Sequence, residues 1–421
     1  MELGYLRILC LSNLKEHVET LIPWALLLGI FYLISIFLAE RIFPQRSLLI
    51  FVFVTAAAFR LTLFPLYPSL SDDLYRYRWD GKVQQVGYNP YLVRPTDPQF
   101  AFLRNEAPGI SAPEYAAVYG PVLEEVFWLS VSLTDRIVLL KSPFLLFDLG
   151  TILLLFRLLP VLGISPLRAL VYAWSPLPVV EFAASGHNDA LPVFAFVLAL
   201  LFYEKKQGKL SLAALSCSAL AKLYAGFLFP VFLLRTGWKR LWVPVLVAGV
   251  AFAPYLDDWR SYPDAVSVYM QTWRNNEGLF FFLRQFTATN WAAWRVYLVI
   301  LAAAIVYCLV RKLNPARASF LILGTVLLFS PNVFPWYVTW IVPLLAIYPN
   351  PAYLFFTVAV FLSYHVLILY RTTGVWEEQT LFRLLEYVPF YALLVGGFIA
   401  SRFRRPGTGR DESNGGAPIR L

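Results

Sequence analysis

Two adjacent carboxylates, Asp72 and Asp73, begin a polar, aromatic-rich stretch in a chain that is otherwise very apolar. The stretch reads SDDLYRYRWDGKVQQVGYNPY and covers residues 71–91. Paired carboxylates suit a general base, because one can accept a proton while the other tunes it; they also suit a divalent cation. Asp before an apolar periodic run can instead cap a helix N-terminus. We expect Asp72 to cap or support the helix and Asp73 to face the substrate, so the two form the predicted catalytic pair.

The same stretch carries a stripe of charge if it is helical. Steps of three and four place four side chains on one helix face: Asp73, Arg76, Asp80 and Gln84. A guanidinium at Arg76 can grip a phosphate with two N–H groups, or it can pair with Asp72 or Asp80. The tyrosines and tryptophan of the stretch fit a helix at membrane headgroup depth. We predict a surface helix with Arg76 on a phosphate and Asp80 on substrate, the plainer alternative being a solvated loop with a few ion pairs.

Further polar groups interrupt the apolar segments downstream. Lys222 lies within an apolar stretch, where an ionised side chain costs about 2.5–3.5 kcal/mol, so a phosphate partner would offset its burial. The turn GHND holds His187, Asn188 and Asp189, more polar groups than a helix cap needs. We assign Lys222 to a donor phosphate and the three turn residues to substrate.

Three aromatic side chains complete the predicted site. Tyr119 precedes Gly-Pro, an ordinary helix start, and is a substrate candidate. Trp336 and Tyr337 follow two prolines in PNVFPWYVTW, where they could contact substrate or belong to an interfacial aromatic belt.

The composition is that of a polytopic integral membrane protein. Of the 421 residues 59% are hydrophobic, 17% aromatic and only 14% charged, whereas soluble domains are about one quarter charged. The net charge of +9 resides in short loops beside apolar runs, which is the pattern of topology signals rather than of nucleic-acid binding. Three scattered cysteines and three scattered histidines give no metal spacing and no disulfide framework. We predict no metal and no cofactor, with a divalent cation possible but not indicated.

Apolar runs of about 20 residues predict the membrane-spanning helices. The fold we expect is an all-α bundle with about 11–13 transmembrane or half-spanning helices. The spans are 20–38, 47–66, 138–158, 168–184, 189–204, 211–234, 241–256, 294–311, 317–330, 336–348, 352–370 and 383–401. A single helix over 211–234 would put basic loops on both faces, so we predict two half-helices, 211–221 and 223–234, that reverse at Lys222.

With that reversal the basic loops share the cytoplasmic face, and every candidate site segment falls on the other face. We predict one transmembrane domain over residues 1–401, with an external catalytic loop at 67–137 and a second external loop at 257–293. Residues 402–421 are Gly-rich and polar and are predicted to be a disordered cytoplasmic tail. The expected location is the cell membrane, with the site facing the periplasm or exterior and the N-terminus outside.

A site on that face has no nucleotide-activated donor at hand. Carboxylates, Arg and Lys at membrane level suit a donor anchored by a lipid and activated by phosphate, as in prenyl-phosphate sugars. A single displacement of the phosphate inverts the anomeric centre and needs one base carboxylate. The predicted partners are therefore a polyprenyl-phosphate sugar, a lipid or glycan acceptor and membrane lipids.

The acidic stretch, with Arg three residues after Asp-Asp in the first large external loop, resembles GT-C superfamily glycosyltransferases. It is particularly similar to bacterial polyprenyl-phosphate-mannose-dependent mannosyltransferases of the glycosyltransferase 87 and alpha-mannosyltransferase type. Three further segments resemble the same group: GHNDAL at 186–191, AKLYAGFLFP at 221–230 and PNVFPWYVTWIVPLL at 331–345. The resemblance implies mannose as the hexose, a catalytic Asp at Asp73 or Asp72, and lipid-phosphate contacts at Arg76 and Lys222. One departure is that two spans precede the acidic loop, where the group commonly has one.

Two other functions fit parts of the pattern. Intramembrane Asp148, Glu181 and Lys222 would suit a lipid-linked-sugar flippase or secondary transporter, although no inverted repeat is evident. A degenerate assembly subunit is the third alternative, against which the intact acidic stripe argues. For Asp148 alone, we expect an ion pair with a cation on a neighbouring helix.

Overall fold

A computed structural model describes residues 1–39, 41, 46–105, 109–258 and 261–403. The described residues form helices joined by turns, with no strand among them beyond a single bridge between Asn275 and Asn332. The predicted all-α polytopic class is therefore confirmed. The predicted tail begins at residue 402, and residues 404–421 lie outside the described part.

Seven helical segments in the described chain are long and apolar enough to cross a membrane. They comprise α2 (Val18–Ala39), α3 (Arg46–Leu63), η2 (Leu139–Lys141) with α7 (Ser142–Val161), η6 (Trp238–Arg240) with α13 (Trp242–Phe252) and η7 (Ala253–Asp258), α16 (Asn290–Val310), α20 (Pro351–Ala359) with η8 (Val360–His365) and α21 (Val366–Thr373), and α22 (Thr380–Phe403). A short helix, α1 (Glu2–Leu9), precedes them. The apolar runs thus located these spans to within a few residues.

Shorter apolar helices fill the space between the long ones. They are α10 (Ala190–Glu204), α11 (Gly208–Ala221), η5 (Leu223–Leu228) with α12 (Phe229–Thr236), α17 (Pro315–Phe329), α18 (Pro335–Val338) and α19 (Val342–Leu345). Lys222 has an extended backbone between α11 and η5. A Cβ on Gly208 would lie 3.2 Å from the Thr236 side chain, so the two ends of this pair meet. The predicted reversal at Lys222 is confirmed.

The span predicted at 168–184 is wrong as a single helix. This segment is divided into η3 (Pro166–Ala169), α8 (Leu170–Ala173), α9 (Pro176–Pro178) and the π-helix η4 (Val179–Ala184). Pro176 and Pro178 explain the break, because proline supplies no N–H and disfavours helical geometry in the residue before it. The predicted span 336–348 is likewise divided, into α18 and α19.

The loop at 67–137 folds into short helices beside the bundle. These are α4 (Asp73–Gln85), η1 (Pro98–Phe100), α5 (Ala101–Asn105) and α6 (Pro121–Leu133). Helix α4 packs closely on α6, because Gly81 lies against the backbone of Phe127, which also stacks on Tyr77 at 4.5 Å between ring centres. The 257–293 loop contributes α14 (Ser261–Thr272) and α15 (Leu279–Gln285). The acidic stretch is thus a helix fixed on other helices, not a solvated loop.

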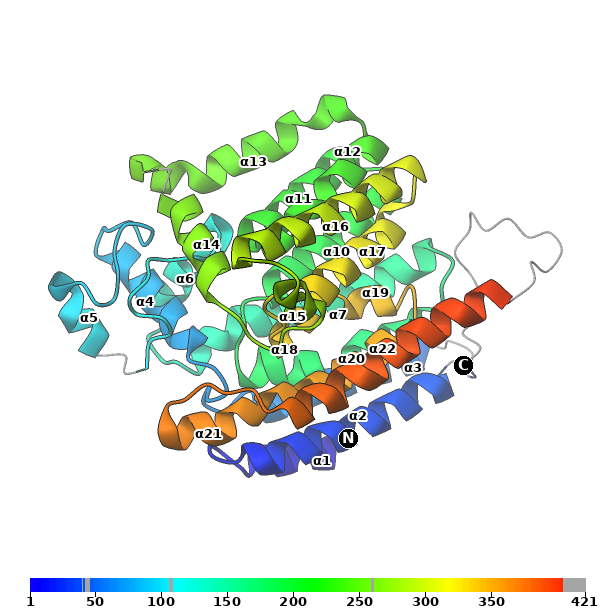
Figure 1. Cartoon of the computed structure of the whole chain (residues 1–421), viewed down its shortest axis with the longest axis horizontal. Coiled ribbons are helices and arrows are strands. Elements are labelled where there is room, and N and C mark those ends of the chain that lie inside the picture. The colour runs from blue at the N-terminus through cyan, green and yellow to red at the C-terminus, as the bar shows by residue number, and fades with distance from the viewer. Residues whose placement is uncertain (40, 42–45, 106–108, 259–260, 404–421) are drawn as a thin grey trace.

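The connections of the bundle gather on two opposite sides (Figure 1). The α4, α5, α14 and α21 segments lie toward one side, and the α12–α13 and α16–α17 connections with the end of α22 lie toward the other. On the latter side Asn314 donates to Glu204 at 3.4 Å, and Gly208 meets Thr236. Helix α11 has 14 residues, which is about 21 Å of helix, between that side and Lys222. Lys222 is therefore well separated from the basic loops.

The buried charge at Asp148 is paired, as predicted. Arg60 of α3 donates to Asp148 of α7 at 2.5 and 3.2 Å, and both side chains are fully buried. Tyr172 adds a hydrogen bond to the same carboxylate at 2.8 Å. This cluster joins three helical segments and is a structural element of the bundle.

Candidate functional site

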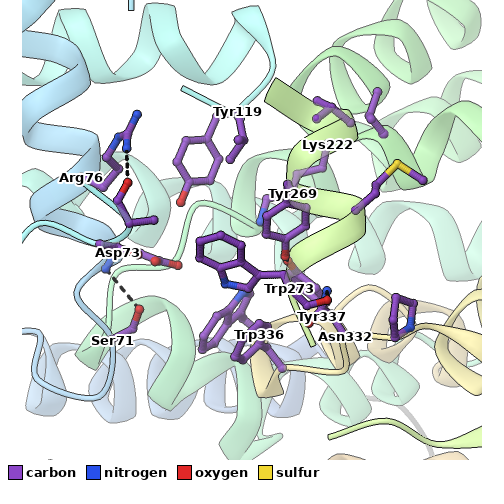
Figure 2. Close-up of a pocket in the computed structure, with 18 of the residues that line it drawn as sticks. Ser71, Asp73, Arg76, Tyr119, Lys222, Tyr269, Trp273, Asn332, Trp336 and Tyr337 are labelled. Atoms are coloured by element: carbon purple, nitrogen blue, oxygen red, sulfur yellow. Dashed lines mark hydrogen bonds between the residues drawn. The ribbon is translucent and has the colours of Figure 1, made fainter. Parts of the chain in front are cut away.

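A cavity of about 600 Å³ lies between the first loop, the Lys222 reversal, α14 and the residues around α18 (Figure 2). Seven of the predicted site residues line it: Asp72, Asp73, Arg76, Tyr119, Lys222, Trp336 and Tyr337. They come from segments more than 100 residues apart in the chain, and the fold brings them together.

Asp73 is the first residue of α4 and faces into this cavity. Its backbone N–H donates to Ser71 Oγ at 3.2 Å, and its carboxylate lies 3.7 Å from His187 Nδ1. Burial raises the pKa of Asp73 from 3.8 to about 6, against the opposing effects of Lys222 and the Ser111 hydroxyl. A carboxylate with this pKa is ionised at neutral pH and basic enough to take a proton from a hydroxyl in a transition state.

Asp72 occupies the N-cap position of α4, but its side chain makes no capping hydrogen bond. Of the two roles expected for Asp72, the side-chain cap is therefore wrong, since Ser71 accepts from the first turn instead; the supporting role stays a prediction. Burial raises the pKa of Asp72, and the positive charge of Lys15 opposes that rise. Asp72 thus presents its carboxylate to the cavity beside Asp73.

The guanidinium of Arg76 is largely occupied by the protein. Its Nε donates to both Asp80 oxygens at 2.9 and 3.1 Å, and Nη1 donates to the carbonyls of Ala112 and Tyr115 at 3.2 and 3.0 Å. Among the described residues Nη2 has no partner, and this atom is buried. Arg76 therefore fixes the 112–115 segment on α4, and the geometry does not give it the two-pronged phosphate grip that we expected.

Asp80 is fully buried, and it is not among the residues that line the cavity. Burial raises its pKa to about 6, against the lowering effect of Arg76. The sequence placed Asp80 on the correct helix face. However, the carboxylate orients Arg76 and does not point to where a substrate would lie.

Lys222 is a cation that lines the cavity. Its Nζ donates to Asp189 at 2.9 Å and lies 5.8 and 5.2 Å from the ring centres of Tyr119 and Tyr337. The side chain is 14% exposed, in contrast to the fully buried Asp189. Gly120 allows this arrangement, because a Cβ there would lie 1.9 Å from the Leu220 carbonyl oxygen. The first loop thus packs directly on the Lys222 reversal.

The three turn residues lie behind the cavity wall and do not line it. Asp189 accepts from Trp340 Nε1 at 2.6 Å as well as from Lys222. The two amide heteroatoms of Asn188 are buried without hydrogen bonds in the described structure. The geometry therefore gives these residues supporting positions, where we had expected direct substrate contact.

His187 lies between the Asp73 carboxylate and a second carboxylate, Glu181. Its Nε2 lies 3.4 Å from Glu181, which also accepts from the Tyr364 hydroxyl at 2.9 Å. The imidazole stacks on Trp336 at 3.8 Å between ring centres. His187 thus packs against Trp336 and lies beside the Asp73 carboxylate.

The sequence did not predict an aromatic wall that comes from α14 and from Trp273, the residue after it. Tyr269 donates to or accepts from Tyr337 at 2.7 Å between hydroxyl oxygens, and Trp273 stacks on Tyr269 at 5.3 Å. Both line the cavity (Figure 2), as does Trp376 after α21. The clustered aromatics of YMQTW at 269–273 were the available signal, but nothing in the sequence placed that loop opposite α4.

Among the described residues, no three His, Cys, Asp or Glu side chains are grouped as metal ligands. The cationic side chains that line the cavity are Lys15, Arg76 and Lys222.

Comparison with known proteins gives one family match. Residues 5–237 match the family described as alpha-(1->6)-mannopyranosyltransferase, N-terminal domain. The match begins before α2, so both long helices that precede the acidic loop lie within it. No curated protein matches the chain.

Proposed function

Because the chain belongs to the alpha-(1->6)-mannopyranosyltransferase N-terminal-domain family of GT-C-type membrane mannosyltransferases, we propose that its donor is a polyprenyl-phosphate mannose. The observation that supports this most is the shared cavity of Asp73 and Lys222. In the proposed reaction a hydroxyl attacks the anomeric carbon as an anionic phosphate leaves it. This cavity offers a base for the hydroxyl and a cation for the phosphate.

In the proposed reaction Asp73 takes the proton of the acceptor hydroxyl as its oxygen attacks the anomeric carbon. The carbon–oxygen bond to the phosphate breaks, and the electron pair leaves with the phosphate. Lys222 is the proposed phosphate contact, because its ammonium group makes one hydrogen bond to the residues that the structure describes and can donate three. The charge that develops on the leaving phosphate would be stabilised by this fixed cation.

The remaining residues have positioning roles in this proposal. Arg76 and Asp80 hold the 112–115 segment, and Asp189 fixes the direction of Lys222. The rings of Trp336, Tyr337 and Tyr269 form an apolar surface beside the base, suited to the sugar and the first prenyl units.

The stereochemistry has a direct consequence for the donor. A single displacement inverts the anomeric centre. If this chain makes the alpha bond that the family description names, the mannosyl phosphate it uses must be beta. A beta donor should therefore be consumed and its alpha anomer should not.

We place the cavity on the non-cytoplasmic face. This rests on the separation between Lys222 and the basic connections, together with the preference of Lys and Arg for cytoplasmic loops. A membrane-impermeant thiol reagent tests it with a cysteine at Ser71, which lines the cavity, in a Cys10→Ser background, because Cys10 is exposed. Labelling of Ser71→Cys in intact spheroplasts is expected, and labelling only after lysis would contradict the orientation.

The transporter alternative loses its main support. Asp148 is paired with Arg60, and Lys222 is paired with Asp189, so two of the three charges on which it rested are in ion pairs.

The proposal is tested by mannose transfer from polyprenyl-phosphate mannose to a mannolipid acceptor in detergent. Asp73→Asn and Lys222→Gln should each lower kcat by at least about a hundredfold. Tyr307→Phe, at a 54% exposed position on α16, is the control and should transfer at the wild-type rate. Full activity in Asp73→Asn would exclude the proposed base.

A further inference from the structure

A second group of lining residues surrounds Lys15 and comes from other elements than the one that carries Lys222. Six lining residues form it, and we call them the Lys15 rim: Lys15, Leu70, Asp72, Leu367, Tyr370 and Trp376. They come from the α1–α2 connection, the start of the acidic loop, and α21 with the residues after it. In Figure 1, α21 lies beside α1 and α2, whereas α11, α14 and α16 lie across the molecule.

The two neighbouring carboxylates face different ends of the cavity. Asp73 lies 3.7 Å from His187, and the charge that acts on it most strongly is that of Lys222. The charge that acts on Asp72 is that of Lys15. Successive residues at a helix start point in directions about 100° apart, which accounts for the difference. A group bound against Asp72 at the rim is thus adjacent to Asp73.

The rim presents aromatic faces and a carboxylate together. Lys15 Nζ lies 5.2 Å from the Tyr370 ring centre, and Trp376 meets Tyr370 edge to face at 5.4 Å. Trp376 is 44% exposed, and its indole N–H is fixed by Asn275 Oδ1 at 3.1 Å. The ring is therefore oriented while much of its surface stays open.

The Asp72 carboxylate makes no hydrogen bond to any part of the chain that the structure describes. Its two oxygens can accept from neighbouring hydroxyl groups, and exposed indole and phenol faces can pack on the C–H face of a pyranose. Lys15 and Asp72 bring opposite charges to the rim, so the rim offers no net positive charge to an anionic headgroup.

We propose that the Lys15 rim is the acceptor subsite and that it binds an uncharged sugar, an inference that rests on the proposed function. The acceptor is then a glycan or glycolipid whose terminal pyranose packs on Trp376 and Tyr370 and hydrogen-bonds Asp72. Its reacting hydroxyl loses a proton to Asp73 and bonds to the anomeric carbon of the donor. The donor phosphate leaves toward Lys222, so the two substrates occupy opposite ends of one cavity.

Initial rates at varied acceptor and donor concentrations test this assignment. Trp376→Leu and Tyr370→Leu should each raise the acceptor KM by about tenfold or more, and leave the donor KM unchanged. Trp376→Phe and Tyr370→Phe keep an aromatic face and should be affected much less. The matched control is Trp242→Leu, at a 52% exposed tryptophan of α13, which should leave both constants unchanged.

The Asp72→Asn variant distinguishes the roles of the two carboxylates. It should raise the acceptor KM while retaining most of kcat, in contrast to the loss of kcat in Asp73→Asn. A rise of the donor KM in the Leu variants, or unchanged constants in both, would overturn the proposal.

A binding measurement keeps the subsite testable without turnover. Octyl mannoside, an uncharged sugar probe, should bind the wild-type protein in saturation-transfer NMR, and the signal should fall in Trp376→Leu and Tyr370→Leu. Binding without any transfer from polyprenyl-phosphate mannose would refute the proposed donor and leave the subsite standing. Equal signals in wild type and both variants would refute the subsite.

Discussion

Replacement of Asp73 by Asn is expected to abolish transfer and, at neutral pH, to stabilise the protein. The pKa of Asp73 is raised from 3.8 to about 6, chiefly by burial, so the folded state binds a proton more tightly than the unfolded state does. The stability that this provides is fully present below pH 3.8 and is lost as the pH rises through about 6.

The size of the effect follows from the two pKa values. The rise from 3.8 to about 6, at about 1.36 kcal/mol per pH unit, amounts to up to about 3 kcal/mol of lost stability at pH 7. Asn has nearly the same shape and carries no charge, so Asp73→Asn should recover most of this free energy of unfolding. Near pH 4 the two proteins should be equally stable.

Thermal unfolding in detergent, followed with a thiol-reactive fluorescent dye, measures the difference. Cys308 is buried and becomes reactive on unfolding, while Cys10 is exposed and contributes a constant signal. Melting temperatures of both proteins are compared from pH 4 to pH 8. An Asn variant that is no more stable than the wild type at pH 7 would refute the claim that burial holds this carboxylate in a costly ionised state.

Four further predictions follow from the same geometry. Lys222→Gln leaves the buried Asp189 without its cation and should cost about 3–5 kcal/mol in stability; adding Asp189→Asn should restore stability but not transfer, as melting and rate assays will show. Transfer by the wild type should rise with pH through about 6 as Asp73 ionises and then level off, whereas a flat profile from pH 5 to 8 would argue against this base. His187→Phe keeps the stack on Trp336 but loses the imidazole, so it should fold normally and shift the pH profile of kcat; an unchanged profile would show that the ring acts only by packing. Arg60→Met should destabilise the bundle by about 3–5 kcal/mol by leaving Asp148 unpaired, and unchanged melting would contradict that pairing.

Much of the bundle could be predicted because a membrane imposes a simple length requirement on apolar runs. Helix α2 covers Val18–Ala39 where 20–38 was expected, and the chain reverses at Lys222 as the distribution of basic loops required. The prolines within the predicted spans 168–184 and 336–348, which are Pro176, Pro178 and Pro343, were visible in the sequence. Hydropathy alone did not show that they divide those spans into short turns, because apolar content is the same in a broken helix.

The residue types of the site could be predicted from the sequence, but the contacts between them could not. Periodicity placed Arg76 and Asp80 on one face, and their ion pair confirms that spacing. Periodicity could not show that the Arg76 guanidinium also donates to two backbone carbonyls, because the 112–115 segment is distant in sequence. The burial of His187 and the aromatic wall from α14 likewise depend on tertiary packing, which no local pattern encodes.

The most direct test of the account is a structure of the protein with a non-transferable analogue of polyprenyl-phosphate mannose. We expect the phosphate within about 3 Å of the Lys222 ammonium and the anomeric carbon in front of the Asp73 carboxylate. The Lys15 rim should remain open for the acceptor. A phosphate bound at Lys15, or one on the side of the basic connections, would contradict it.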